Sequence, residues 1–283
     1  MNKNFISLFK FLLIILAFSS LVKGIMNSIL IGHDFDYRGA ILMWEGINHY
    51  QYMMKGNEIS EIQNGYYGQG FFVLLYPFTL LPWDYSKLVW TLINVLLSFF
   101  LPIFLSKKLN LDNEKTFYLL VLFLASTPCR VAIGNGQFSL IIMAFLLLPF
   151  FYKKSFYIIL SGIAYLKYNI GYLLFLYFLS HKQTKNIFFS LIVFVLSWFF
   201  YSFITNSNLF NNLFEPLKLA LYIKQTDGLV YGFSFLKFIF QQYNYLDFFI
   251  LSLSIICSFL LLNKIKKFKS NSIKLSLFCL IIL

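Results

Sequence analysis

Long apolar runs separated by short polar segments occur along the whole chain. The full-length runs cover residues 5–25, 86–106, 116–133, 137–152, 186–204 and 246–263. Since about 20 apolar residues in a helix cross the roughly 30 Å hydrocarbon core, these runs predict membrane-spanning helices. Two shorter stretches, 70–82 and 229–240, would cover only about 18 Å each, so they either dip into the membrane without crossing or are tilted or kinked spans. We therefore predict an all-α, polytopic transmembrane helical bundle that forms a single domain over residues 1–283.

The two ends of the chain have distinct patterns. Lys3 and Lys10 precede a short apolar run, as in a cleavable signal peptide. Because further spans follow, a retained signal-anchor helix is favoured. The last residues, SIKLSLFCLIIL, begin like a span but stop after about a dozen residues, too few to cross a bilayer. This pattern predicts a C-terminally truncated chain that lacks further helices.

Lysine-rich segments predict the orientation in the membrane. They lie at 107–115, 153–154, 182–185 and 264–269. The positive-inside rule places all four in the cytoplasm if the two short stretches dip without crossing and 155–180 forms a hairpin. The outer side then receives residues 26–67, the turn at 134–136, the hairpin tip near 167–169 and residues 205–228. The outer juxtamembrane loop 26–67 holds five of the eleven acidic residues: Asp34, Asp36, Glu45, Glu58 and Glu61.

Composition supports a membrane protein and excludes several other classes. The chain is 59% apolar and 12% charged, with a mean hydropathy of +0.74, which excludes a soluble enzyme, a secreted disulfide scaffold and a disordered protein. The net charge of +12 comes from lysine clusters between spans, so we expect no nucleic-acid partner. The excess of lysine over arginine is typical of an AT-rich bacterial genome and predicts the bacterial inner (plasma) membrane. With no C-x-x-C motif and only isolated histidines, we expect no metal and no cofactor.

Acidic residues follow the first predicted helix. Asp34 and Asp36 lie beside Arg38, which is what a general base and its orienting partner need. The alternative is a solvated loop with a local Asp–Arg pair. Further on, Tyr50 ends a short interfacial segment, and Tyr67 lies in a glycine-rich stretch, Gly65–Gly70. Tyr50 would lie at headgroup level. The aromatic side chains around Tyr67 suit a groove for a sugar or a polyprenyl chain, and a plain interfacial turn is the alternative.

Two cations interrupt apolar segments. Arg130 precedes a Gly-Asn-Gly turn that leads into Gln137, where a helix N-terminus would provide an anion site. Lys167 lies in the middle of 155–180, where it needs an anion or water. Alternatively, two half-helices simply meet at an interfacial lysine.

The order of these motifs resembles glycosyltransferase family 87, a group of membrane mannosyltransferase-like proteins of the C-type glycosyltransferase superfamily. The resemblance covers about residues 10–185, and two departures are Tyr168 after Lys167, where relatives often have proline, and the absence of C-terminal helices. The matching motifs are Asp34-Phe35, Gly46-x-x-x-Tyr50, Tyr76-Pro77 (Tyr-x-Pro in the family), Gly136-Gln137 and Gly162…Lys167.

The resemblance implies a glycosyltransferase that moves a sugar, mannose being the commonest, from a polyprenyl-phosphate donor to a lipid or glycan acceptor on the outer face, with inversion. Asp34 would be the general base, and Asp36 would pair with Arg38 or orient the acceptor. Arg130, Gln137 and Lys167 would bind the donor phosphate, and Tyr50 and Tyr67 the acceptor. The alternatives are a membrane transporter or lipid flippase, and a non-catalytic membrane subunit.

Overall fold

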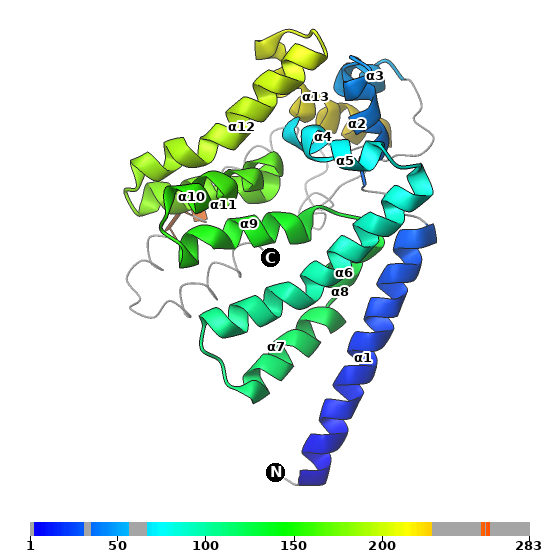
Figure 1. Ribbon diagram of the computed structural model, residues 1–283, viewed down its shortest axis with the longest axis vertical. Helices are drawn as coiled ribbons and strands as arrows, with labels where there is room; N and C mark the ends of the chain where they lie inside the picture. The colour runs from blue at the N-terminus through cyan, green and yellow to red at the C-terminus, as the bar shows by residue number, and fades with distance from the viewer. Residues whose placement is uncertain (1–2, 31–34, 57–66, 228–255, 258, 261–283) are drawn as a thin grey trace, which may run out of the picture.

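The computed structural model describes residues 3–30, 35–56, 67–227, 256–257 and 259–260. Within these ranges every regular element is a helix, which confirms the all-α prediction (Figure 1). The predicted span 246–263 lies almost entirely outside the described residues, as does the whole stretch 229–240. The elements are α1 (Lys3–Leu30), α2 (Tyr37–Trp44), α3 (His49–Met54), α4 (Gly70–Leu74), α5 (Tyr76–Thr79), α6 (Trp83–Lys108), α7 (Asn113–Ala125), α8 (Thr127–Gly134), α9 (Ser139–Phe151), α10 (Ser155–Ser161), the 3₁₀ helix η1 (Gly162–Leu166), α11 (Tyr168–Ser180), α12 (Thr184–Ile204) and α13 (Leu209–Asp227).

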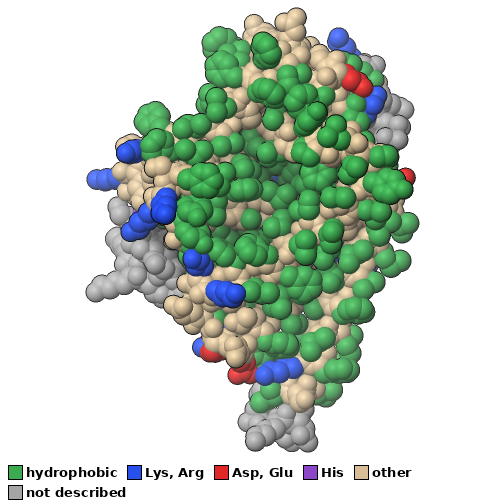
Figure 2. All heavy atoms as spheres, in the orientation of Figure 1, with side chains coloured by type: hydrophobic (Ala, Val, Ile, Leu, Met, Phe, Trp, Pro, Cys, Tyr) green, Lys and Arg blue, Asp and Glu red, His purple; other side chains and the backbone are tan. Residues whose placement is uncertain are grey.

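Three of the described helices, α1, α6 and α12, are long and apolar enough to cross a membrane. They contain 28, 26 and 21 residues, so even the shortest extends about 32 Å. Many of their large apolar side chains are exposed, among them Phe18, Leu96 and Phe203, and apolar side chains cover most of the face shown in Figure 2. The chain is therefore a multi-pass membrane protein, and the spans predicted at 5–25, 86–106 and 186–204 are confirmed.

The predicted span 116–133 is a bent pair of helices instead of one straight helix. α7 and α8 meet at an angle of 54°. The Ser126 hydroxyl accepts a hydrogen bond from Cys129 N at 3.3 Å and so caps α8, and Pro128 lies in the first turn of that helix. Because proline has no N–H and fits the first turn of a helix, α7 stops at Ala125 and a new helix starts at Thr127.

The predicted span 137–152 is shorter than expected. α9 has 13 residues and covers about 20 Å, less than the hydrocarbon core. It begins only at Ser139 because the chain before it makes a turn in which Gly136 has a φ of +69°. That left-handed conformation suits glycine and ends the preceding helix.

Residues 155–180 form the predicted hairpin. At its tip, Lys167 Nζ is 2.7 Å from Ser139 Oγ at the start of α9. Farther along α11, the Tyr177 ring is 4.5 Å from the Phe150 ring at the end of α9. The chain therefore runs along α9 through α10 and η1, reverses at Lys167 and returns through α11.

Basic loops gather at one end of the bundle, which we call the lysine end. Lys10 Nζ forms an ion pair with Glu114 Oε1 at 2.9 Å, which joins the beginning of α1 to the beginning of α7. Lys108 Nζ lies 4.4 Å from the centre of the Tyr152 ring, which joins the end of α6 to the end of α9. The hydrogen bond from Lys115 Nζ to Asp112 (2.6 Å) lowers the pKa of that exposed carboxyl below its usual value. The lysine end contains Lys107, Lys108, Lys115, Lys153 and Lys154.

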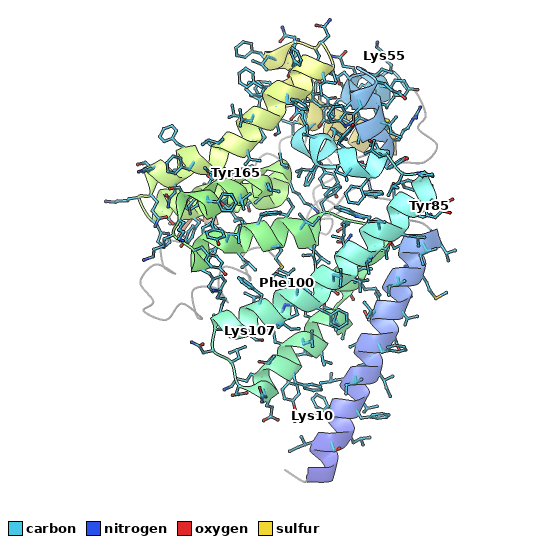
Figure 3. All side chains as sticks on the ribbon, in the orientation of Figure 1. Lys10, Lys55, Tyr85, Phe100, Lys107 and Tyr165 are labelled. Carbon is cyan, nitrogen blue, oxygen red and sulfur yellow. The ribbon has the colours of Figure 1, made fainter. Side chains whose placement is uncertain are left out.

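The opposite end of the bundle carries a polar cap, which consists of α2, α3, α4, α5 and α13. Within it, α13 contacts α3, and α2 contacts α4 and α5 (Figure 1). Figure 3 shows Lys10 and Lys107 at the lysine end and Lys55 and Tyr85 near the cap. The described part of the predicted outer loop 26–67 is thus largely helical. α4 and α5 have five and four residues, each too few to cross a membrane.

Candidate functional site

The hairpin tip brings a lysine to the start of another helix at the cap end of the bundle. Lys167 Nζ donates a hydrogen bond to Ser139 Oγ and lies 5.3 Å from the centre of the Tyr67 ring. The Ser139 hydroxyl in turn donates to Gln137 Oε1 at 3.2 Å. We call these four residues the Lys167 centre. Because an ammonium group and the N-terminus of α9 meet here, the local charge is positive and suits an anion such as phosphate.

A buried tryptophan holds the turn that precedes the Lys167 centre. Trp90 Nε1 donates to the Gly136 carbonyl O at 2.7 Å, and its ring packs on Phe138 at 4.7 Å. A Cβ at Gly136 would lie only 3.2 Å from Phe35 Cβ, so the turn and residue 35 are in close contact. The hydrogen bond from Trp90 to the Gly136 carbonyl holds the backbone just before Gln137 in place.

Phe35 anchors the residues that lead into α2, next to the turn before Gln137. Its ring is fully buried and stacks on Trp83 and Trp90, with centroid distances of 5.9 and 5.1 Å. Asp36 follows directly and is also fully buried, and its carbonyl accepts the hydrogen bond of Ala40 N as α2 begins. A carboxylate at this position is stabilised by the helix N-terminus. Asp36 is therefore next to the residue that contacts the turn before Gln137, whereas Asp34 lies outside the described residues.

The two candidate tyrosines are in contact but differ in exposure. Tyr67 is half-buried, and its ring packs on Phe71 and Phe138 at 4.9 and 5.1 Å. Tyr50 is fully buried and donates a hydrogen bond from its hydroxyl to the Tyr67 carbonyl O at 2.6 Å. Tyr50 thus supports Tyr67 from behind, while Tyr67 faces Lys167. The predicted contact of Tyr50 with an acceptor stays a prediction.

Arg130 lies apart from the Lys167 centre. It is half-buried on α8, and its backbone carbonyl faces Gly24 of α1, where an added Cβ would lie 3.3 Å away. Among the described residues no hydrogen bond or ion pair joins it to Ser139 or Lys167. The structure therefore groups two of the three predicted donor ligands, Gln137 and Lys167, and leaves Arg130 nearer to α1.

Sequence reasoning missed several residues of the site. Ser139 follows Gln137 by two positions, and its place at a predicted helix start was a usable signal. Trp90 gave no such signal, because a tryptophan early in a span is typical of an interfacial belt.

No group of three His, Cys, Asp or Glu side chains that could hold a metal occurs in the part of the chain that the structure describes. Of the histidines, His49 is buried in the polar cap, and His181 is at the end of α11. The His181 ring lies 4.4 Å from the Tyr177 ring. The Lys167 centre itself offers one ammonium group, one amide and two hydroxyls.

The family model of glycosyltransferase family 87 matches residues 66–226, more than half of the chain. The chain belongs to glycosyltransferase family 87. The matched region contains all four residues of the Lys167 centre, whereas Asp34 and Asp36 precede it. No curated protein and no solved structure matches the chain.

Membership of family 87 confirms the resemblance found in the sequence and identifies the chain as an enzyme with glycosyltransferase activity. The fold agrees with it, because the described helices form a membrane bundle whose candidate site is near one end. Because the family is one of enzymes, membership favours a glycosyltransferase over the transporter and non-catalytic alternatives.

Proposed function

We propose that this family 87 member transfers a sugar, mannose in the first instance, from a polyprenyl-phosphate donor to a lipid or glycan acceptor outside the cytoplasm of a bacterial cell. The observation that carries the proposal is the position of Lys167. Its ammonium group lies at the N-terminus of α9, at the cap end, where the Trp90-held turn and residue 35 also meet. A lipid-linked phosphate would find complementary charge there, close to the end of the bundle.

The proposed reaction needs few groups. The acceptor hydroxyl oxygen attacks the anomeric carbon, the bond from that carbon to the phosphate oxygen breaks, and polyprenyl phosphate leaves with the electron pair. Lys167 and Gln137 would stabilise the charge that develops on the phosphate. A carboxylate takes the proton of the acceptor hydroxyl. Attack from the face opposite the phosphate inverts the anomeric centre.

Two carboxylates are available for proton transfer. We assign the general base to Asp34, which matches the Asp-Phe pattern of the family, and the orientation of the acceptor to Asp36. Tyr67, with Tyr50 behind it, would contact the acceptor. Arg130 would contact the donor from α8.

The orientation follows from the two ends of the bundle. The lysine end contains basic loops that the positive-inside rule assigns to the cytoplasm. The candidate site is at the other end, so it would face outward in the inner membrane. A lipid-linked donor presented from the outer leaflet would then reach Lys167.

The binding experiment compares lysine variants in nanodiscs, with a polyprenyl-phosphate mannose as the probe. Loss of a charge-assisted contact to phosphate should raise the Kd of Lys167→Ala by about tenfold or more, while Lys167→Arg keeps part of the affinity. The matched control is Lys55→Ala, which removes one exposed cation at the same end (Figure 3). Wild-type affinity in a well-folded Lys167→Ala protein would refute the role of Lys167.

A transfer experiment separates the enzyme from its alternatives. Vesicles with purified protein receive the donor carrying a radiolabelled mannose, together with bacterial membrane extract as the source of acceptors. We expect label in a product other than the donor lipid. Label that only changes leaflet would indicate a flippase, and no change at all would indicate a non-catalytic subunit.

A further inference from the structure

A buried cluster of polar side chains lies in the polar cap, behind the Lys167 centre. We call it the amide cluster: Asn48, Gln69, Tyr201, Asn212 and Glu215, all at most 8% exposed. They come from the segment before α3, the segment before α4, the end of α12 and the first half of α13. Burying polar groups costs desolvation free energy, which their hydrogen bonds must offset, so we examined what these bonds hold in place.

Glu215 joins α13 to α3. Its Oε2 accepts a hydrogen bond from Asn48 Nδ2, and its Oε1 accepts one from Gln51 Nε2, both at 2.7 Å. Asn48 also caps α3, because its Oδ1 accepts from Gln51 N at 3.2 Å. The Tyr201 hydroxyl accepts from His49 N at 3.1 Å and donates to Asn48 Oδ1 at 3.3 Å. The start of α3 is therefore held from two helices.

Asn212 joins α13 to the segment before α4. Its side-chain Nδ2 donates to Ser202 Oγ and Ser207 Oγ at 2.8 and 2.6 Å, and its Oδ1 accepts from Asn48 Nδ2 at 3.1 Å. With the side chain fixed in this way, the backbone carbonyl of Asn212 accepts a hydrogen bond from Gln69 Nε2. The position of Gln69 thus depends on α13.

The segment that contains Gln69 touches the hairpin tip. Gly68 N donates to the Leu166 carbonyl O at 2.7 Å, one residue before Lys167. A Cβ at Gly70 would lie 2.5 Å from Leu166 Cδ2 and from Ser197 Oγ, so this segment fits closely between the hairpin and α12. The ring of Tyr67, in the same segment, lies below the Lys167 ammonium group. A shift of Gln69 would therefore move Gly68, which contacts Leu166, and Tyr67, which contacts Lys167.

Of the two polar atoms in the Gln69 amide, only Nε2 forms a hydrogen bond among the described residues. Its Oε1 is buried and has no hydrogen-bond partner among the described residues. A methionine of similar length would fill the same space without this desolvated oxygen. The amide therefore contributes through one bond, from Nε2 to the Asn212 carbonyl, an acceptor that α13 itself leaves unpaired because Pro216, four residues later, has no N–H.

We propose that Gln69 is a positioning residue, which links α13 to the Lys167 centre and holds Tyr67 and Leu166 where Lys167 binds the donor. The inference rests on the proposed function, because it assigns donor binding to Lys167. It extends the site to α13, whose Asn212 and Glu215 would set donor affinity without touching the donor.

The first experiment uses Gln69→Met, with Gln183→Met at an exposed position near the lysine end as its matched control. We expect the Kd for polyprenyl-phosphate mannose to rise about tenfold in Gln69→Met, together with a lower thermal midpoint, because the buried Asn212 carbonyl loses its donor. A merely structural role would lower the midpoint and leave the affinity of the folded protein unchanged. In a Lys167→Ala background, Gln69→Met should cause no further loss. Wild-type affinity in Gln69→Met, or an equal loss in both backgrounds, would overturn the inference.

The second experiment does not depend on donor binding. Amide hydrogen exchange is measured in the peptide 67–72 for Asn212→Ala and for its neighbour Asn211→Ala, whose side chain is exposed. Loss of the buried amide should accelerate exchange in this peptide about tenfold, whereas the Asn211 variant should match the wild type. Equal exchange in the two variants would refute the link from α13 to the 67–70 segment. Wild-type donor affinity in Lys167→Ala would instead refute the proposed function alone, since the exchange result still decides the link.

Discussion

The closest backbone approach at the hairpin tip predicts the effect of one methyl group. Gly171 lies in α11, four residues after Lys167, and faces the backbone of η1. A Cβ added there would lie 2.5 Å from the Ala164 carbonyl O and 2.6 Å from Tyr165 Cα. Both neighbours are backbone atoms, so neither can rotate away. Gly171→Ala should therefore push α11 and η1 apart.

The magnitude follows from these distances. An ordinary carbon–oxygen contact is about 3.4 Å, so the two segments must separate by about 1 Å. Overpacking of this kind costs about 1–3 kcal/mol, against a gain of up to about 1 kcal/mol for alanine over glycine in a helix. We expect a net loss of about 1 kcal/mol. The same shift would lengthen the 2.7 Å bond from Lys167 to Ser139 beyond hydrogen-bonding distance.

Two assays test this prediction. Unfolding in mixed micelles, followed by tryptophan fluorescence, should show lower stability for Gly171→Ala, and the Kd for polyprenyl-phosphate mannose should rise about tenfold. The matched control is Gly24→Ala in α1, where the nearest atom to an added Cβ is 3.3 Å away. Because only slight overpacking opposes the helix preference of alanine there, its stability should match the wild type or exceed it by up to about 1 kcal/mol. Equal stability and equal Kd in the two variants would mean that α11 and η1 are not in close contact at Gly171, and would refute the reasoning.

The other predictions concern the turn, the orientation and the carboxylates. Trp90→Phe removes the donor to the turn carbonyl and should lower unfolding free energy by about 1–3 kcal/mol; an unchanged value would mean that this bond contributes nothing. In intact cells, in a background without native cysteines, Lys55→Cys should react with a membrane-impermeant thiol reagent and Lys107→Cys should not; the reverse result would invert the orientation. Asp34→Asn should lower the rate of mannose transfer by about 10²–10⁴ with donor binding retained, and Asp36→Asn should be milder. Reversed effects would exchange the two roles, and no effect in either would refute carboxylate catalysis.

Several features followed from the sequence alone because they depend on local chemistry. The spans α1, α6 and α12 were predictable, since transfer of an apolar run into lipid depends mainly on its own residues. The hairpin reversal at Lys167 was predictable as well, because a lysine interrupts an apolar segment at that point. The motif order also led to the correct family. Within the candidate site, Gln137 and Lys167 were identified in advance, because cations and turns in apolar segments are conspicuous.

Other features required the tertiary structure. Nothing in the sequence indicated that Lys167 would contact Ser139, 28 residues earlier, or that Gln69 would contact Asn212, 143 residues later. In the sequence, Arg130 and Lys167 are equivalent candidates, because both are cations that interrupt apolar segments. Only the packing shows that Arg130 lies near α1 and Lys167 at the start of α9. α9 also proved too short for a full span. Hydrogen-bond partners and burial depend on how helices pack against one another, and that arrangement is a property of the whole bundle, which no single segment encodes.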